Sequence, residues 1–88
     1  MNNSRIRSLH DRQYKEIVTA LAKARKAAGI SQSAVSLVVG LAQPDISKIE
    51  SLERRLDIVE FLTIATYIGS HSGESDLVDK LIGKAREL

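Results

Sequence analysis

The stretch from Gln32 to Ile49 constrains the fold of this chain more than any other part of it. It divides at Gly40 into two short segments, each with apolar residues at helical spacing. Gly40 accepts a backbone that other residues avoid, and Ser36 is small where the two segments would cross. The residues that such a pair of helices would bury are Val35, Val39, Leu41, Ile46 and Ile49. We therefore expect two short helices packed across a tight turn.

An apolar stripe at three- and four-residue steps predicts a long helix before this pair, from about Leu9 or Asp11 to Ala28. The stripe consists of Tyr14, Ile17, Leu21, Ala24 and Ala28. Gly29 follows as a residue that accepts positive φ, and Ser31 is a good N-cap for a second helix over residues 32–39.

Two later helix starts have clear signals. Pro44 is favoured at the first helical position and predicts a third helix that ends at Glu50 or Leu52. Asp57 and Glu60 have the spacing of a capping box, in which the side chain of each residue accepts a hydrogen bond from the backbone N–H of the other. They predict the start of a fourth helix.

The remainder of the chain reads as one more helix after a short linker. Gly69 is expected to close the fourth helix, and residues 69–74 have the composition of a loop. No strand pattern is present, so the predicted fold class is all-α with five helices. The predicted units are a flexible basic N-terminal arm over residues 1–8, the main domain over residues 9–69, and a C-terminal amphipathic helix within residues 75–88 that could serve dimerisation.

Composition excludes several classes of function. The 88-residue chain has no cysteine, so it has neither disulfides nor thiolate metal sites. No apolar run approaches the roughly 20 residues that span a bilayer, and residues 1–7 lack the apolar part of a secretion signal. His10 and His71 have no partner at metal-ligand spacing. We expect a cytoplasmic protein without membrane association, enzymatic activity or cofactor, and no small-molecule effector is evident.

The charge is unevenly distributed along the chain. The net charge is +2, but residues 1–30 carry a local charge of +5 and the rest carries −3. This asymmetry suits a protein with one face toward phosphate, although solvated helices with ordinary surface charges would give the same count. The few aromatic residues leave little for stacking single-stranded bases, which argues against RNA loops and single strands as ligands.

Residues from about 21 to 69 resemble the Xre family of helix-turn-helix proteins, which includes lambdoid phage repressors and Cro proteins. The resemblance rests on residues 25–32, 35, 39–41, 46–50 and 54–57. It implies a lambda-repressor-like domain whose third helix enters the major groove of double-stranded DNA. The implied function is transcription regulation, with repression the favoured outcome.

The resemblance also implies which residues touch DNA. The base-facing positions are Gln43, Pro44, Ser47 and Lys48. Their chemistry fits this role, since glutamine bonds adenine through two groups and a lysine ammonium suits guanine O6 and N7. The expected phosphate contacts are Gln32, Ser33, Arg54 and Arg55. The alternative for Gln32 is an ordinary exposed residue at a helix start, and the alternative for the base-facing set is a plain polar helix face.

Arg25 and Glu50 match a pair that forms a salt bridge in the family, between the first helix and the end of the third. We expect a partly buried pair that holds the recognition helix at a fixed angle. The alternative is two unrelated surface charges, which would contribute little.

Two positions depart from the family pattern. Family members commonly carry glycine in the turn after this glutamate, whereas residues 50–53 read Glu-Ser-Leu-Glu. Leucine resists positive φ, so either the third helix is longer or the turn differs, which affects the reach of Arg54 and Arg55. Ser36 replaces the usual alanine, and its hydroxyl is expected to bond the carbonyl of Gln32.

A homodimer is the expected assembly. Helix-turn-helix dimers place their recognition helices about 34–36 Å apart on one face of DNA, so the operator should be an inverted repeat. The last two helices are the expected dimer surface, with Leu77, Leu81 and Leu88 as contacts, unless these leucines close the monomer core. The second hypothesis is an antitoxin-like or regulatory module that docks a protein partner through its C-terminal helix.

Overall fold

Five helices make up the part of the chain that the structure describes. This computed structural model describes the backbone of residues 4–85 and the side chains of residues 11–84. The helices are α1 (Ser4–Ala27), α2 (Gln32–Val39), α3 (Gln43–Glu50), α4 (Ile58–Ser72) and α5 (Leu77–Ala85). Residues 4–85 contain no strand, so the predicted all-α class is confirmed. None of these helices is both long enough and apolar enough to cross a membrane.

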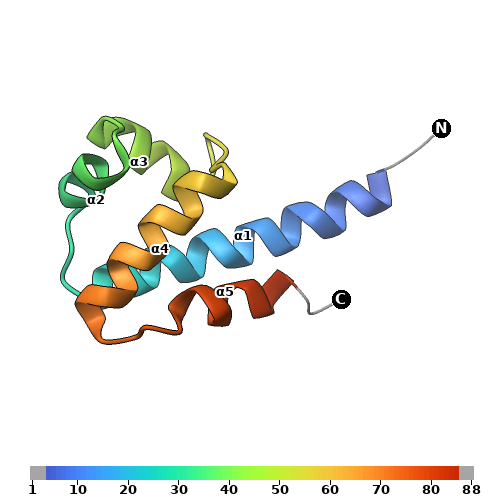
Figure 1. The fold of residues 1–88 in the computed structure, drawn as a ribbon. Helices are drawn as coiled ribbons and strands as arrows, with labels where there is room; N and C mark the ends of the chain where they lie inside the picture. Colours follow the sequence, from blue (N-terminus) through green and yellow to red (C-terminus); the bar gives the residue numbers. More distant parts are fainter. Residues whose placement is uncertain (1–3, 86–88) are drawn as a thin grey trace.

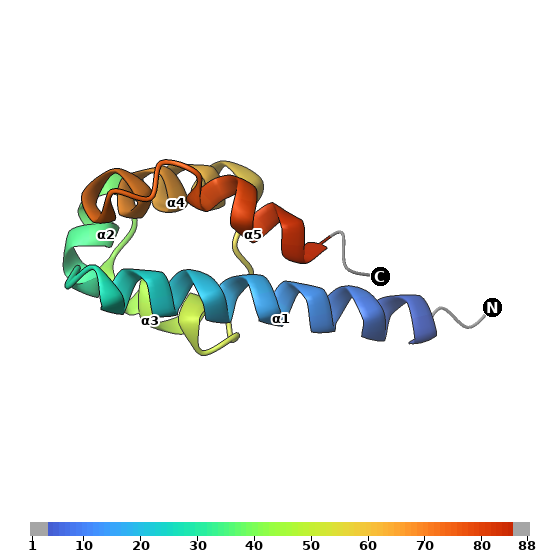
Figure 2. The ribbon, with the colours of Figure 1, turned by 90° about the horizontal axis from the view of Figure 1, so that it is seen from below.

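The helices form two layers. Seen from below, α1 and α3 lie in one layer and α4 and α5 in the other, with α2 at one end (Figure 2). α5 packs beside α1, while α4 contacts both α2 and α5 (Figure 1). The N-terminal part of α1 extends beyond the other helices (Figures 1 and 2). The α2–α3 pair therefore occupies the opposite end of the molecule from the start of α1.

The core between the layers contains the residues that the α2–α3 pattern predicts to be buried. Val35, Ile46 and Ile49 are at most 2% exposed, and Val39 and Leu41 pack against the core partly buried. The other helices contribute Val18, Leu21, Phe61, Ile64, Ala65 and Ile68.

Two of the three predicted dimer contacts belong to this same core. Leu77 and Leu81 are 5% and 2% exposed, because α5 turns its apolar face onto α1 and α4. The prediction that they form a dimer surface is therefore wrong, and they close the monomer. Leu88 lies outside the described residues.

Most helix ends follow the local signals in the sequence. Gly29 and Gly40 have φ of +72° and +78°, the left-handed backbone expected after α1 and α2. The Ser31 hydroxyl caps α2 by accepting from the N–H of Ala34 at 3.0 Å. Asp57 and Glu60 form the predicted capping box, with bonds of 2.7 and 3.1 Å.

The start of α1 differs from the prediction. The helix begins at Ser4 instead of Leu9 or Asp11, so the backbone of residues 4–8, predicted as a flexible arm, is helical. Arg5, Ile6 and Arg7 include no glycine or proline, and each added residue extends an existing helix at the gain of one hydrogen bond.

The end of α4 also differs. The helix continues through Gly69 to Ser72 and ends at Gly73, so the predicted linker over residues 69–74 is largely helical. Gly69 serves a close approach instead of a helix end, because a Cβ built there would lie 2.6 Å from the carbonyl oxygen of Glu74. Gly73, with φ of +77°, is the residue that closes the helix.

We therefore expect Gly69→Ala to destabilise the protein by about 1–3 kcal/mol, since the methyl group collides with backbone that cannot move freely. Gly83→Ala is the matched control in α5, where an added Cβ meets nothing within 4 Å. It should stabilise by about 1 kcal/mol through helix propensity. Urea denaturation measures both, and effects of the same sign would contradict the close-approach role of Gly69.

Candidate nucleic-acid interface

The turn between α2 and α3 is held by backbone and side-chain hydrogen bonds. The N–H groups of Gly40 and Leu41 both donate to the carbonyl of Ser36, at 2.9 and 3.0 Å. The buried Ser36 hydroxyl donates to the carbonyl of Ser33 at 2.7 Å. The prediction of a bond to Gln32 is thus wrong by one residue, because a helical serine also reaches the carbonyl three positions back.

α3 begins one residue earlier than predicted, at Gln43, with Pro44 second in the helix. The extended residue before it, Ala42, donates its N–H to the Asp45 carboxylate at 3.3 Å. This bond holds the start of the helix, and proline in the first turn removes only an N–H that has no partner there. Asp45 is consequently directed at its own helix end.

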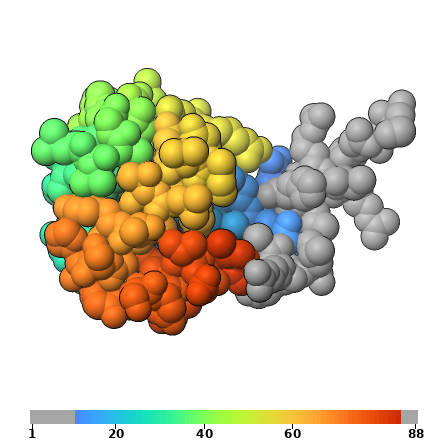
Figure 3. All heavy atoms as spheres, in the orientation of Figure 1, coloured from blue at the N-terminus to red at the C-terminus, as the bar shows by residue number. Residues whose placement is uncertain are grey.

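One face of α3 is buried and the opposite face is open. Ile46 and Ile49 point into the core, whereas the four predicted base-facing side chains are all exposed. These four are Gln43, Pro44, Ser47 and Lys48. In the space-filling view, α2 and α3 form the upper left part of the surface, away from α5 (Figure 3). The structure therefore brings the predicted base-facing residues together on a free surface.

The ion pair expected between Arg25 and Glu50 is present. The guanidinium donates to both carboxylate oxygens, at 2.6 and 2.9 Å, and a third N–H donates to the carbonyl of Ile30 at 2.7 Å. The two side chains are only 9% and 17% exposed. Burial raises the pKa of Glu50, but hydrogen bonds from Arg25 and Gln32 outweigh it and leave the pKa below its ordinary value. The pair joins α1 to the C-terminal end of α3.

Two glutamines extend this pair to the other end of α3. The Gln32 side chain donates to the Glu50 carboxylate at 2.9 Å and accepts from the Gln43 amide at 2.7 Å. Hydrogen bonds thus run continuously from Arg25 through Glu50 and Gln32 to Gln43. The bond from Gln43 uses one of its two N–H groups, so an oxygen and an N–H remain for the edge of an adenine.

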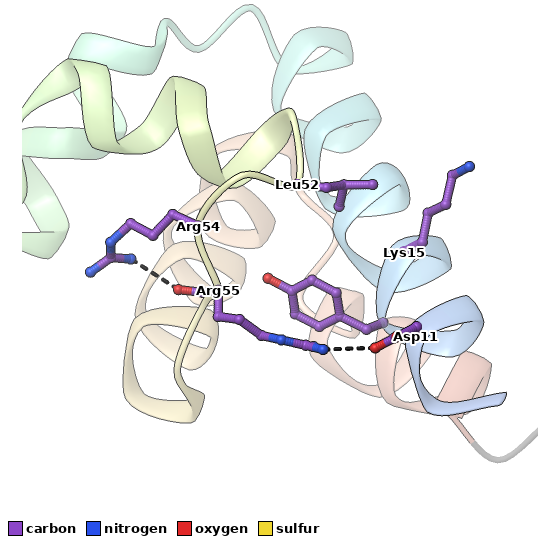
Figure 4. Close-up of a pocket in the computed structure, with 6 residues that line it drawn as sticks. Asp11, Lys15, Leu52, Arg54 and Arg55 are labelled. Atoms are coloured by element: carbon purple, nitrogen blue, oxygen red, sulfur yellow. Dashed lines mark hydrogen bonds and ion pairs between the residues drawn. The ribbon is translucent and has the colours of Figure 1, made fainter. Parts of the chain in front are cut away.

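The side chains of Arg54 and Arg55 point in different directions and bind different carboxylates. Arg54 donates to both carboxylate oxygens of Glu60, at 3.1 and 3.0 Å. These bonds raise the pKa of Arg54 and lower the pKa of Glu60. Arg55 donates to Asp11 at 2.7 Å and lies 4.4 Å from the centre of the Tyr14 ring. In Figure 4 the two guanidinium groups point in opposite directions from the loop.

The loop that carries these arginines is fixed to α1. The Tyr14 hydroxyl accepts from the backbone N–H of Leu56 at 2.9 Å. An open cavity of 320 Å³ lies between the loop and α1, and Lys15 extends from its rim (Figure 4). The sequence indicates Glu60 only as part of a capping box and not as the partner of Arg54. No local signal links Asp11 to Arg55, which lies 44 positions away.

The turn after α3 resolves the question posed by Leu52. The helix ends at Glu50, and Leu52 takes the left-handed conformation, with φ of +69°. Its N–H donates to Ile49 at 3.0 Å and that of Glu53 to Lys48 at 2.8 Å. These hydrogen bonds form a helix end of the left-handed type, in which the left-handed residue is usually glycine. For leucine this left-handed conformation costs roughly 1–2 kcal/mol. The expectation that leucine would avoid positive φ is therefore wrong.

The histidines supply no metal site in the described part of the chain. His71 is exposed, its ring lies 4.4 Å from that of Tyr67, and Nδ1 is 3.2 Å from the Tyr67 carbonyl. The side chain of His10 lies outside the described residues. No group of three His, Asp or Glu side chains among those described is placed to hold a metal ion.

Two short helices packed across a left-handed glycine, with an exposed polar face on the second, define a helix-turn-helix fold of the DNA-binding type. The helix-turn-helix family model matches residues 21–74, more than half of the chain. The chain therefore belongs to this family, in its Xre or lambda repressor-like branch of DNA-binding transcription regulators. No curated protein matches the chain.

We expect Arg25→Ala to lower the free energy of unfolding by about 3 kcal/mol at pH 7, because it leaves Glu50 partly buried without its counter-ion. The lowered pKa of Glu50 means that the pair stabilises the fold above the unfolded-state pKa and loses this effect as pH falls through the lower folded-state value. The difference in free energy of unfolding between the unsubstituted protein and Arg25→Ala should therefore become smaller below about pH 4.

Lys80→Ala is the control, since Lys80 and Glu74 form an exposed pair, 55% and 44% exposed. It should change stability by less than about 1 kcal/mol. Urea denaturation from pH 3 to pH 7 measures both variants. Equal stability of Arg25→Ala and Lys80→Ala at pH 7 would show that the buried pair does not hold α3.

Proposed function

We propose that this chain is a sequence-specific transcriptional repressor that reads an inverted-repeat operator in double-stranded DNA as a homodimer. The observation that carries the proposal is the chain of hydrogen bonds from Arg25 to Gln43. It ties α3 to α1 and orients Gln43 before DNA arrives. A preformed surface binds without first losing side-chain entropy, which favours specific recognition.

Four side chains of α3 select bases in this proposal. Gln43 bonds adenine, Lys48 donates to guanine, Ser47 bonds a base or a phosphate, and Pro44 offers apolar contact to a thymine methyl. They are exposed together on α3, and the glutamine is already oriented by Gln32. One such face contacts few bases, so a second copy on the next turn of DNA supplies the remaining specificity.

Phosphate contacts set the register of the domain on DNA. Gln32 and Ser33 lie in the first turn of α2, where backbone N–H groups and the helix dipole favour an anion. Arg54 and Arg55 complete the set after exchanging their carboxylate partners for phosphate. For Arg55 this exchange costs little, because the arginine and Asp11 are 69% and 52% exposed.

Repression is the simplest consequence of such binding. A domain that occupies promoter DNA blocks polymerase by occlusion and needs no catalysis, cofactor or small-molecule effector. We propose that it acts in this way in the cytoplasm.

An antitoxin-like or regulatory interaction module is the second candidate. Leu37 is 85% exposed on the outer side of α2, and Val38 beside it is 43% exposed. Apolar side chains so open to solvent favour a protein partner when they form a patch. Salt-sensitive binding to duplex DNA separates the two functions, because phosphate neutralisation makes affinity fall with salt.

The test of the proposed function is selection from a randomised duplex DNA pool at physiological salt. Enrichment of an inverted repeat with half-sites about one helical turn apart supports a dimeric reader of sequence. No enrichment would overturn the proposal, and a pull-down from cell extract would then test the interaction module.

Lys48→Ala should weaken binding to the selected operator by about 1–3 kcal/mol, because it removes a base contact. Lys23→Ala removes the same charge from an exposed position of α1 and is the control. Fluorescence anisotropy with the operator and with an unrelated duplex compares the variants. Equal losses on both duplexes would mean that Lys48 contacts phosphate and does not select a base.

Asp11→Asn should tighten binding to every duplex, because it releases Arg55 for a phosphate. The slope of log affinity against log salt should steepen by about 0.9 for one added contact. Asp76→Asn changes net charge equally at the start of α5, away from α3, and is the control. If both variants bind alike, Arg55 does not reach the DNA backbone.

A further inference from the structure

The hydrogen bonds that join Glu50 through Gln32 to Gln43, the amide relay, have a fixed direction. An ionised carboxylate only accepts hydrogen bonds, so Gln32 must turn its amide nitrogen toward Glu50, and this nitrogen donates at 2.9 Å. The amide oxygen of Gln32 is then left for Gln43, which donates to it at 2.7 Å. The orientations of both amides therefore follow from the charge on one carboxylate.

Glu50 has little freedom to turn or to lose this charge. Its Oε2 accepts from Nε of Arg25 at 2.6 Å, and its Oε1 accepts from Nη2 of Arg25 and from Gln32, both at 2.9 Å. The Glu50 side chain is only 17% exposed. Burial raises the pKa of Glu50, but the hydrogen bonds from Arg25 and Gln32 outweigh burial and leave the pKa below its ordinary value. Glu50 is thus ionised at neutral pH and held in one orientation.

The direction of the amide relay decides what Gln43 offers to a base. Gln32 uses one of its two N–H groups, so one oxygen acceptor and one N–H donor remain. Adenine offers the matching pair, a donor at N6 and an acceptor at N7, whereas guanine offers two acceptors, O6 and N7. To meet guanine with two N–H groups, Gln43 would have to place its own oxygen against the oxygen of Gln32.

We propose that Glu50 is a specificity-determining residue of the DNA reader, which acts through the amide relay and rejects guanine at the base pair that Gln43 contacts. Glu50 is a positioning residue, since Arg25 and Gln32 occupy its carboxylate. Specificity of this kind comes from a penalty on the wrong partner and not from an added contact with the right one. The inference rests on the proposed function and adds to it a residue that selects a base without touching it.

The experiment uses the full chain and the operator obtained by selection from the randomised pool. A second selection with Gln43→Ala identifies the A·T pair that Gln43 reads, because only that position of each half-site should lose its preference. Fluorescence anisotropy then compares this operator with one that carries G·C at that position in one half-site. The unsubstituted protein should favour the A·T operator roughly tenfold or more.

Glu50→Gln should raise the affinity for the G·C operator and lower the preference for A·T to about threefold or less. An amide donates as readily as it accepts, so the amide relay can reverse and leave both N–H groups of Gln43 for guanine. A merely structural role for Glu50 would lower the affinity for both operators and would not improve binding to the wrong one. Circular dichroism checks that each variant is folded.

Arg25→Gln is the matched control. It neutralises the other member of the same ion pair, but at about pH 8 it leaves an ionised carboxylate as the acceptor for Gln32. The fold is destabilised in both variants, because each removes one partner of a buried pair. With Arg25→Gln, however, the preference for A·T should stay at roughly tenfold or more.

Gln32→Leu decides the question if Glu50→Gln does not fold. It keeps the ion pair intact and breaks the amide relay, so that Gln43 is free to turn toward either base. Binding to both operators should weaken, because a proposed phosphate contact is lost, and the preference for A·T should again fall to about threefold or less. An unchanged preference would contradict the role of the amide relay.

The double substitution Gln32→Glu with Glu50→Gln tests the direction itself. It moves the carboxylate one step along the amide relay, so that residue 32 only accepts and Gln43 must again donate to it. The preference for A·T should return to roughly tenfold. Both affinities should fall, because the carboxylate now lies nearer to the DNA phosphates.

Two outcomes would overturn the role of Glu50 while the DNA reader stands. The first is an operator in which no adenine preference depends on Gln43. The second is a preference for A·T that Glu50→Gln leaves unchanged, or changes only as much as Arg25→Gln does. Failure of the randomised pool to yield any operator would instead defeat the proposed function, and this inference with it.

Discussion

The buried pair of Arg25 and Glu50 is the interaction on which the rest of the structure depends. α2 and α3 have eight residues each, too few to be stable helices alone in water. Their placement therefore comes from packing and from this pair, which ties α3 to the long α1. The pair is tolerable at low exposure because the Ile30 carbonyl and the Gln32 amide satisfy further groups on both partners. The same hydrogen bonds orient the residue that begins the recognition helix.

The cations beside α3 fall into two groups with different consequences for DNA binding. Lys48 is exposed on α3, whereas Arg54 and Arg55 each carry a carboxylate partner in the free protein. Under the proposed function, each of these arginines gives up its carboxylate partner in order to contact phosphate. The net free energy of this exchange depends on how exposed the existing ion pair is. Arg54 and Glu60 are 33% and 15% exposed, so this exchange costs more than that of Arg55. Under the proposed function, the pair with Glu60 therefore restrains Arg54 from contacting phosphate more than the pair with Asp11 restrains Arg55.

Local signals predicted the helices and the α2–α3 turn, because caps and apolar spacing act over a few residues. Gly40, Ser31 and Asp57 each satisfy backbone groups of the adjacent helix end, which any sequence context would require. The prediction that Gly69 ends α4 is wrong because, in the sequence, a helix-ending glycine cannot be distinguished from a glycine needed for close approach until the neighbouring backbone is placed. The partner of Arg55 lies on a distant helix, so only the assembled fold reveals it. Similarly, the apolar face of α5 is buried because the fold places it against α1 and α4, which the sequence of α5 alone does not indicate.

α1 holds the recognition helix of the proposed dimeric reader of DNA. Its C-terminal half carries Arg25, whose hydrogen bonds to Glu50 tie α3 to α1. Leu77 and Leu81 are buried in the monomer core, so an interface in the described part of the chain has to use other apolar side chains, such as those exposed on α2 and at the start of α4. In the proposed homodimer, the recognition helix of each copy therefore takes its angle from one continuous helix of 24 residues.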